Sequence, residues 1–192
     1  GGEMIGDPLD LKMFTATGWT LQEPDVEEKD EDMVAPPMVF PPGASLSPDL
    51  EGDDDRGLAI VRRFDFTSNH QRMSVIARTS HERGSHVFLK GAPEVVRDLC
   101  EPSSVPPDFA KVVQGYTRQG LRLLACAHKY EKSWRWDVAQ KVTREKAEGG
   151  LTFIGVLLLE NRLKVETGGV IDQLKAAQIN CCMVTGDHIL TG

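Results

Sequence analysis

The alternation of apolar and polar residues predicts a series of strands in the middle of the chain. The stretches LAIVRRFDF (58–66), QRMSVIAR (71–78) and SHVFLK (85–90) are rich in β-branched and aromatic residues and are separated by polar turns. Two further apolar stretches, LRLLACAHKY (121–130) and LTFIGVLLLE (151–160), also have the length of strands. Because antiparallel strands can be joined by short turns, we expect an antiparallel sheet.

Helical patterns lie before and between these strands. Asp7 is a candidate N-cap ahead of Pro8, and Gly18 follows DPLDLKMFTAT, so this stretch is expected to be a helix. Further helices are expected at 93–100, 106–120 and 136–149. Helices interspersed with an antiparallel sheet are typical of an α+β fold, here a twisted sheet flanked by helices.

The pattern changes near residues 160–164. VETGGVIDQLKAAQ (165–178) predicts a helix, INCCMVTG (179–186) a strand and DHILTG the start of another helix. Helix, strand and helix in succession are typical of a doubly wound α/β domain. We therefore expect an α+β domain over residues 1–160 and a truncated α/β piece over residues 161–192.

The segment 22–57 differs in composition from the rest of the chain. It is rich in proline and glycine and carries twelve acidic and two basic residues, a net charge of −10. This composition predicts a long loop or mobile insertion, with room for a short strand at 38–40. Since the whole chain carries −7, the remainder carries +3, which is compatible with an anionic ligand such as a nucleotide.

Composition also argues against several classes of protein. The longest apolar run, 151–159, is far shorter than the ~20 residues of a membrane-spanning helix, so we expect no direct membrane insertion by this chain. No dense basic cluster indicates nucleic-acid binding. The four cysteines and five histidines lack metal-ligand spacing, so we expect reduced cysteines and no metal site.

Three places carry candidate binding chemistry, and each also has an ordinary structural interpretation. Lys90 followed by Gly91 suits a phosphate or a close ligand, or is a solvated strand end. Phe66 is either a core residue or an exposed ring on which a base stacks. Thr185, Gly186 and Asp187 follow an apolar strand, where ligands often bind, although Asp187 also suits a helix N-cap.

Six motifs, in their order along the chain, resemble the nucleotide-binding (N) domain of the P-type ATPases. KGAPE followed by MVTGD is the most specific pair. GDPLDLKMFTATGW and ENRLK resemble the type 5 branch, B subgroup, of endolysosomal pumps associated with polyamine or cation export. The other two motifs are FDFTSNHQRMSVI and GLRLLACA.

The resemblance implies a role in ATP binding for each matching residue. Asp10 matches the acidic residue near the adenine amino group, and Phe66 matches the ring that stacks on adenine. Lys90 matches the lysine of the nucleotide pocket, which Gly91 and Ala92 line.

The resemblance also implies a phosphate side of the site. Arg122 matches the arginine that reaches the β-phosphate, although its position near a strand start also suits an edge arginine with its head in water. The hinge to the phosphorylation domain is matched by Asn161 and Lys164, and the loop that handles the γ-phosphate and magnesium by Thr185, Gly186 and Asp187.

Two family motifs are absent from the 192 residues: Asp-Lys-Thr-Gly-Thr, which holds the phosphorylated aspartate, and the magnesium-binding Gly-Asp-Gly. His188 also replaces an asparagine common after TGD. The resemblance therefore implies a chain that binds ATP, has no catalytic residue of its own and does not turn over alone. Its expected partners are ATP with Mg²⁺ and the phosphorylation, actuator and transmembrane domains of a pump, on the cytosolic face of late endosomes or lysosomes.

Two other classes of function stay open at this point. The acidic segment 22–57 suits a non-catalytic interaction module that binds a basic partner. A hydrolase of the haloacid dehalogenase type is the other, although the chain lacks a DxDx[TV]-like nucleophile motif.

Overall fold

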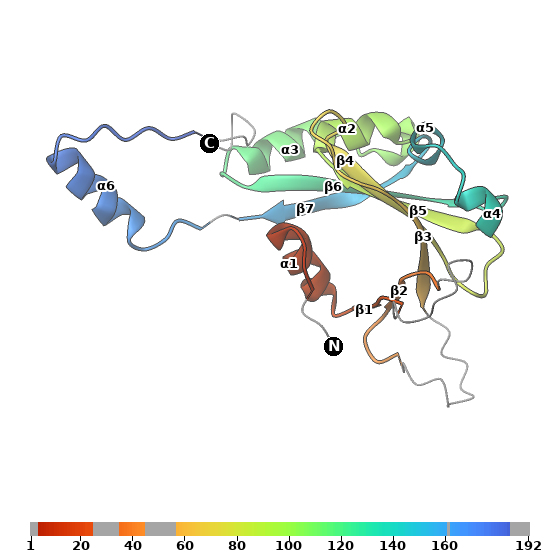
Figure 1. Ribbon diagram of the computed structural model, residues 1–192. Coiled ribbons are helices and arrows are strands. Elements are labelled where there is room, and N and C mark those ends of the chain that lie inside the picture. The colour runs from red at the N-terminus through yellow and green to blue at the C-terminus, as the bar shows by residue number, and fades with distance from the viewer. Residues whose placement is uncertain (1–3, 25–34, 45–56, 161, 185–192) are drawn as a thin grey trace.

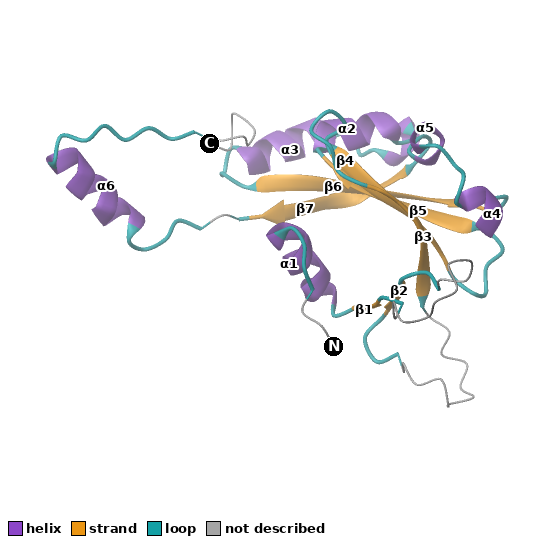
Figure 2. Cartoon of the chain, viewed as in Figure 1, coloured by secondary structure: helices purple, strands orange, loops and turns teal. Residues whose placement is uncertain are grey.

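The computed structural model describes residues 4–24, 35–44, 57–160 and 162–184, and its centre is a seven-stranded sheet (Figures 1 and 2). Each strand pairs antiparallel with its neighbour in sequence, so the sheet order is also the chain order. The strands are β1 (Thr20–Gln22), β2 (Met38–Phe40), β3 (Leu58–Phe64), β4 (Arg72–Arg78), β5 (Ser85–Gly91), β6 (Arg122–Glu131) and β7 (Thr152–Leu159). The antiparallel sheet predicted from the sequence is confirmed.

Helices α2 and α3 pack on one face of the sheet, and α1 lies on the other (Figure 1). The helices are α1 (Pro8–Thr17), α2 (Pro93–Leu99), α3 (Phe109–Thr117), α4 (Trp136–Ala139), α5 (Arg144–Ala147) and α6 (Thr167–Ala176), with a 3-10 turn η1 at Pro102–Ser104. Among the described helices, none combines the length and the apolar character that crossing a bilayer requires.

The main core lies between the sheet and the helices on the α2 side. Alternate residues of the central strands face it and are almost fully buried, among them Ile76, Val87, Leu89 and Ala125. A second cluster forms where α3 packs on β6 and β7, and there the Phe109 and Phe153 rings meet edge to face, 5.4 Å apart. Because strand residues alternate between faces, the intervening side chains of β4, β5 and β6 are left on the α1 side.

The start of the chain forms as its sequence predicts. The Asp7 carboxylate accepts a hydrogen bond from the Leu9 N–H, and Pro8 occupies the first helical position. The helix ends at Gly18, whose φ of 68° suits a residue without a Cβ. Strand β2 is observed at residues 38–40, where the composition of segment 22–57 allows a short strand.

The single helix predicted over 136–149 is wrong, because two short helices, α4 and α5, occupy this stretch. Thr143 adopts an extended backbone (φ −75°, ψ 160°), and its hydroxyl caps α5 by accepting from the Lys146 N–H. A β-branched residue that can cap favours a new helix start over continuing the old helix.

Helix α6 forms as predicted, but residues 179–184 of the strand predicted at 179–186 are not in a strand. These residues are exposed, with Val184 at 91% exposure, and they pair with no neighbouring strand within the described ranges. Backbone groups need a partner strand to form a ladder, which the apolar pattern alone does not supply. The last two residues of that stretch and the helix expected after them lie outside the described residues.

Candidate functional site

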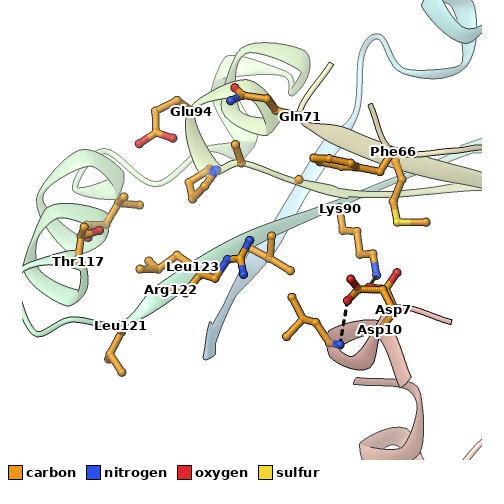
Figure 3. A pocket seen from close by; sticks show the side chains of 17 residues that line it. Asp7, Asp10, Phe66, Gln71, Lys90, Glu94, Thr117, Leu121, Arg122 and Leu123 are labelled. Carbon is orange, nitrogen blue, oxygen red and sulfur yellow. Dashed lines mark hydrogen bonds and ion pairs between the residues drawn. The ribbon is translucent and has the colours of Figure 1, made fainter. Parts of the chain in front are cut away.

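A cavity of about 780 Å³ opens where β5 passes into α2, and it is within the usual size of a small-molecule site. Its lining comes from α1, the β3–β4 loop, β4, β5, the start of α2, α3 and the start of β6 (Figure 3). The six residues that the resemblance assigns to the nucleotide pocket all line this one cavity: Asp10, Phe66, Lys90, Gly91, Ala92 and Arg122.

Lys90 joins the sheet to α1 across the cavity. Its side chain is only 24% exposed and lies on the α1 face of β5, because Leu89 before it faces the core. The Lys90 ammonium donates a hydrogen bond to the Asp10 carboxylate in the first turn of α1 and forms an ion pair with it. Lys90 is therefore not a solvated strand end.

Phe66 presents its ring to the cavity rather than to the core. Strand β3 ends at Phe64, two residues earlier than the sequence predicts, and Phe64 packs against the main core. Phe66 follows in the β3–β4 loop and is 58% exposed, with its ring above Lys90 in Figure 3. Of the two interpretations open from the sequence, the core position is wrong and the exposure of the ring is observed, while stacking of a base on it stays a prediction.

Gly91 is required by the packing of two strands. A Cβ on this residue would lie 2.6 Å from Arg72 Cβ and 2.7 Å from the Gln71 carbonyl oxygen. The close approach lets the Ala92 N–H donate to that carbonyl at 2.9 Å, which ties the start of α2 to the β3–β4 loop. Gly91 thus lets the strand that carries Lys90 lie close to the loop that carries Phe66. A glycine is needed here because two backbone segments approach each other, and not because a ligand approaches the backbone.

Arg122 opens β6 and lies between the Phe66–Lys90 side of the cavity and the α3 side (Figure 3). Two residues of α3, Val113 and Thr117, form the far wall, and the Thr117 hydroxyl donates to the Val113 carbonyl. Cys126 is the Cα partner of Lys90; burial raises the pKa of its thiol, and the Lys90 charge opposes that rise.

The lining combines one exposed aromatic ring, apolar walls, two cations and three carboxylates. The cations are Lys90 and Arg122, and the carboxylates are Asp7, Asp10 and Glu94. No histidine or cysteine is among the described lining residues, and the described ranges contain no group of three His, Cys, Asp or Glu side chains placed to hold a metal ion. The arrangement suits binding of a planar group that carries anionic and hydrogen-bonding substituents.

The residues expected on the phosphate side are mostly beyond the described part of the chain. Asn161, Thr185, Gly186 and Asp187 lie outside it. Lys164 is exposed just ahead of α6, and its carbonyl accepts from the Thr167 N–H at 3.0 Å. Lys164 is not among the residues that line the cavity.

Several lining residues were not identified from the sequence. Met73 pairs with Lys90 across β4 and β5, so a correct prediction of the register between these two strands would have placed Met73 in the cavity. Gln71, two positions before Met73, also lines the cavity, and Glu94 completes the same motif as Lys90. The α3 wall has no such signal, because its position depends on how a helix packs on the sheet.

Comparison with known proteins gives the relationship of the chain. A family model described as P-type ATPase, cytoplasmic domain N, matches residues 53–166. Polyamine-transporting ATPase 13A3 of Mus musculus is 43% identical over 202 aligned residues, which cover 99% of this chain and 17% of that protein. Probable cation-transporting ATPase 13A5 of Mus musculus is 43% identical over 192 residues, covering 99% of this chain and 15% of that protein.

A fungal protein is similar over the same length. Vacuolar cation-transporting ATPase YPK9 of Saccharomyces cerevisiae is 39% identical over 206 residues, covering 99% of this chain and 14% of that protein. The chain thus spans between 14% and 17% of the length of these three relatives. The chain belongs to the P-type ATPase family, and residues 53–166 correspond to its cytoplasmic N domain.

Proposed function

We propose that this chain binds the adenosine end of ATP and presents the γ-phosphate to the phosphorylation domain of a P-type cation- or polyamine-transporting ATPase. The observation that carries the proposal is the cavity in which the exposed Phe66 ring lies beside Lys90, with Arg122 farther along. A ring, a cation beside it and a second cation farther along match the order of base, sugar and phosphates in a nucleotide.

In this proposal the adenine lies on the Phe66 ring. Stacking of a base on an aromatic side chain contributes ~1–3 kcal/mol, and the ring is open to a ligand because more than half of it is exposed. The Asp10 carboxylate, on the α1 side, accepts from the exocyclic amino group. Lys90 then exchanges part of its ion pair with Asp10 for contact with the nucleotide.

Arg122 meets the β-phosphate, where a guanidinium can make two parallel hydrogen bonds. Fixing the nucleotide at both ends would orient the γ-phosphate, and positioning supplies much of the catalysis in phosphoryl transfer. Because the 192 residues contain no Asp-Lys-Thr-Gly-Thr, we propose that the acceptor aspartate belongs to another part of the pump and that this chain alone does not hydrolyse ATP.

The phosphate side and the domain division are also proposals. Residues 1–160 would form the nucleotide-binding domain, with Asn161 and Lys164 at the hinge and Thr185, Gly186 and Asp187 near the γ-phosphate. Hinge motion would bring the two parts together around ATP. Mg²⁺ would accompany the phosphates, and we assign it no ligand among the described residues, which gather no group of three candidate side chains.

The transported substrate and the location are proposed from the relatives. Their names include a polyamine-transporting, a cation-transporting and a vacuolar ATPase. We propose a polyamine or cation as the substrate of the whole pump. The corresponding place for this chain is the cytosolic face of a late endosomal or lysosomal membrane, beside the actuator and transmembrane domains.

Nuclear magnetic resonance with ATP titrated into the 192-residue chain tests ATP binding. We expect the amide and side-chain resonances of Phe66, Lys90 and Arg122 to shift and to saturate at millimolar ATP. Sodium sulfate at the same concentration is the control and should leave these resonances unchanged. Shifts that are absent from these three residues would contradict the proposal.

A second candidate function rests on the charge of −10 in segment 22–57, which suits docking of a basic partner. Deleting residues 24–35 and 45–56 distinguishes the two candidate functions, because the deletion removes most of the acidic residues but none of those that form β1, β2 or the cavity lining. Nucleotide binding should survive the deletion if the cavity is the functional site, whereas binding of a basic protein should be lost if the acidic segment is the site.

A further inference from the structure

The buried carboxylate of Glu148 lies beneath the loop that carries Phe66, and the mechanism above does not use it. Glu148 follows α5 and is 0% exposed. Its Oε1 atom accepts from the Ser74 hydroxyl at 2.7 Å and from Arg144 Nε at 3.0 Å. Its Oε2 atom accepts from Arg72 Nε at 2.5 Å. Three such donors hold the buried carboxylate in one position.

The two arginines that hold Glu148 also hold the β3–β4 loop. Arg144 donates through one terminal nitrogen, Nη2, to the Asp65 carbonyl at 3.1 Å and to the Arg72 carbonyl at 2.8 Å. Arg72 donates to the His70 carbonyl at 3.2 Å. The guanidinium groups therefore bind the backbone on both sides of Phe66, at residues 65 and 70–72.

The same loop is closed by its own backbone. Thr67 accepts from the N–H groups of His70 and Gln71, at 3.1 and 2.8 Å. Gln71 has a φ of 51°, a conformation that a residue with a Cβ adopts only when its surroundings hold it. The loop conformation therefore depends on contacts around it, and the Arg72–Glu148–Arg144 cluster supplies those on the core side.

Phe66 itself has little packing to hold its ring. The residue is 58% exposed, so the loop backbone, rather than a surrounding core, decides where the ring lies. None of Arg72, Arg144 and Glu148 is among the described residues that line the cavity, and Ser74, which bonds Glu148, faces the core side of β4. The cluster and the ligand site are on opposite sides of the loop.

We propose that Glu148 and Arg144 are positioning residues for Phe66: the carboxylate fixes the arginine, and the arginine fixes the loop from which the ring meets adenine. This inference rests on the proposed binding of ATP. It predicts that changes in the cluster weaken binding of the base and leave binding of the phosphates unchanged.

Arg144→Lys is the decisive variant. Arginine reaches Glu148 through Nε and both carbonyls through Nη2, whereas lysine keeps the charge but has a single nitrogen for all three contacts. Binding of ATP and of inorganic tripolyphosphate is measured by calorimetry on the 192-residue chain. We expect ATP affinity to fall by about tenfold, within the range of one stacking contact, and tripolyphosphate affinity to stay unchanged. The exposed Arg135→Lys is the matched control and should bind both as the native chain does.

Combining Arg144→Lys with Phe66→Ala distinguishes a positioning role of Arg144 from a general effect of the substitution on the fold. In a Phe66→Ala background, Arg144→Lys should weaken ATP binding no further, because the ring through which it acts is gone. Glu148→Gln should act in the same direction, and where it does not fold, as circular dichroism reports, Arg144→Lys decides. Native ATP affinity in Arg144→Lys, or an undiminished loss in the Phe66→Ala background, would overturn the inference.

Hydrogen exchange gives a readout that does not depend on ATP. We expect the amides of residues 65–71 to exchange several-fold faster in Arg144→Lys, while β5 and β6 stay as protected as in the native chain. Unchanged exchange in the loop would overturn the inference even if ATP bound weakly. A native chain that binds no ATP would instead overturn the proposed function, and the exchange result would still show whether the cluster holds the loop.

Discussion

At the scale of single residues, the role proposed for Phe66 in binding would cost the fold little stability. The residue is more than half exposed, and the neighbouring Phe64 supplies the packing that strand β3 needs. A side chain with this exposure contributes little to the free energy of unfolding, so its removal should be felt mainly by a ligand.

Phe66→Ala should therefore weaken ATP binding by roughly five- to 150-fold, the equivalent of one stacked base, and change the free energy of unfolding by less than about 0.5 kcal/mol. Calorimetry and urea unfolding measure the two effects. Phe88→Ala, which removes another partly exposed ring on β5 outside the cavity, is the control and should leave ATP binding unchanged. Equal affinities of the Phe66→Ala and native chains for ATP would refute the assignment.

Gly91 has the opposite character, because the structure gives it a role in packing of the backbone. Gly91→Ala places a methyl group against the backbone of β4 and should lower the free energy of unfolding by about 1–3 kcal/mol. Gly115→Ala in α3 is the matched control: open space surrounds that position, and alanine is the better helix former, so a gain of about 0.5–1 kcal/mol is expected. Urea unfolding compares them, and equal stability of both variants would contradict the packing account.

At the scale of elements, the face of β5 and β6 turned away from the main core carries four rings in contact: His86, Phe88, His128 and Tyr130. The His86 ring stacks on those of Phe88 and His128, and the other contacts are tilted. The His86 Nδ1 and His128 Nε2 atoms are 2.9 Å apart and share one hydrogen bond. Burial and the nearby His86 lower the pKa of His128 from its ordinary value of 6.5, and Glu82 opposes them. The folded state therefore binds this proton less readily than the unfolded chain does.

This lowered pKa of His128 sets the sign of a pH effect. Below pH 6.5 the unfolded chain takes up a proton that the folded chain resists, so the contribution of His128 to stability falls as the pH drops through 6.5. His128→Gln should show a shallower loss of unfolding free energy between about pH 7.5 and 5.5 than the native chain. The exposed His81→Gln serves as the control. An unchanged slope in His128→Gln would show that this histidine is not responsible.

The elements differ in how much of them could be predicted. Strands β3 to β7 and helix α1 follow from periodicity, a proline at the first helical position and a glycine at the end, because these are local signals. The break between α4 and α5 has a local signal in Thr143, which caps α5, but the apolar spacing over 136–149 outweighed it in the prediction. The unformed strand at 179–184 lacked a partner, which an apolar pattern cannot reveal.

Prediction of the site divides in the same way. Motif order brought six lining residues together in advance, since each lies in a short recognisable stretch. In the Arg72–Glu148–Arg144 cluster, Arg144 and Glu148 are four residues apart, but Arg72 lies 76 positions before Glu148, so sequence periodicity carries no sign that the three side chains meet. The phosphate side stays a prediction, because most of its residues lie outside the described ranges.

At the scale of the whole molecule, the ligand cavity belongs to residues before 160, and α6 stands apart from the sheet without a buried residue (Figure 1). A chain of residues 1–160 should therefore keep the unfolding midpoint and the ATP affinity of the 192-residue chain. Residues 19–192, which lack α1 and Asp10, are the contrasting variant and should bind ATP more weakly. Loss of folding in the 1–160 chain would contradict the proposed domain boundary.

The central claim is that adenine binds on the ring of Phe66, and intermolecular nuclear Overhauser effects test it most directly. The measurement uses the 192-residue chain with ATP near saturation and selectively labelled phenylalanine. The account predicts cross-peaks from the adenine H2 and H8 protons to the Phe66 ring. Saturated binding with no such cross-peaks, or with cross-peaks only to another phenylalanine, would contradict it.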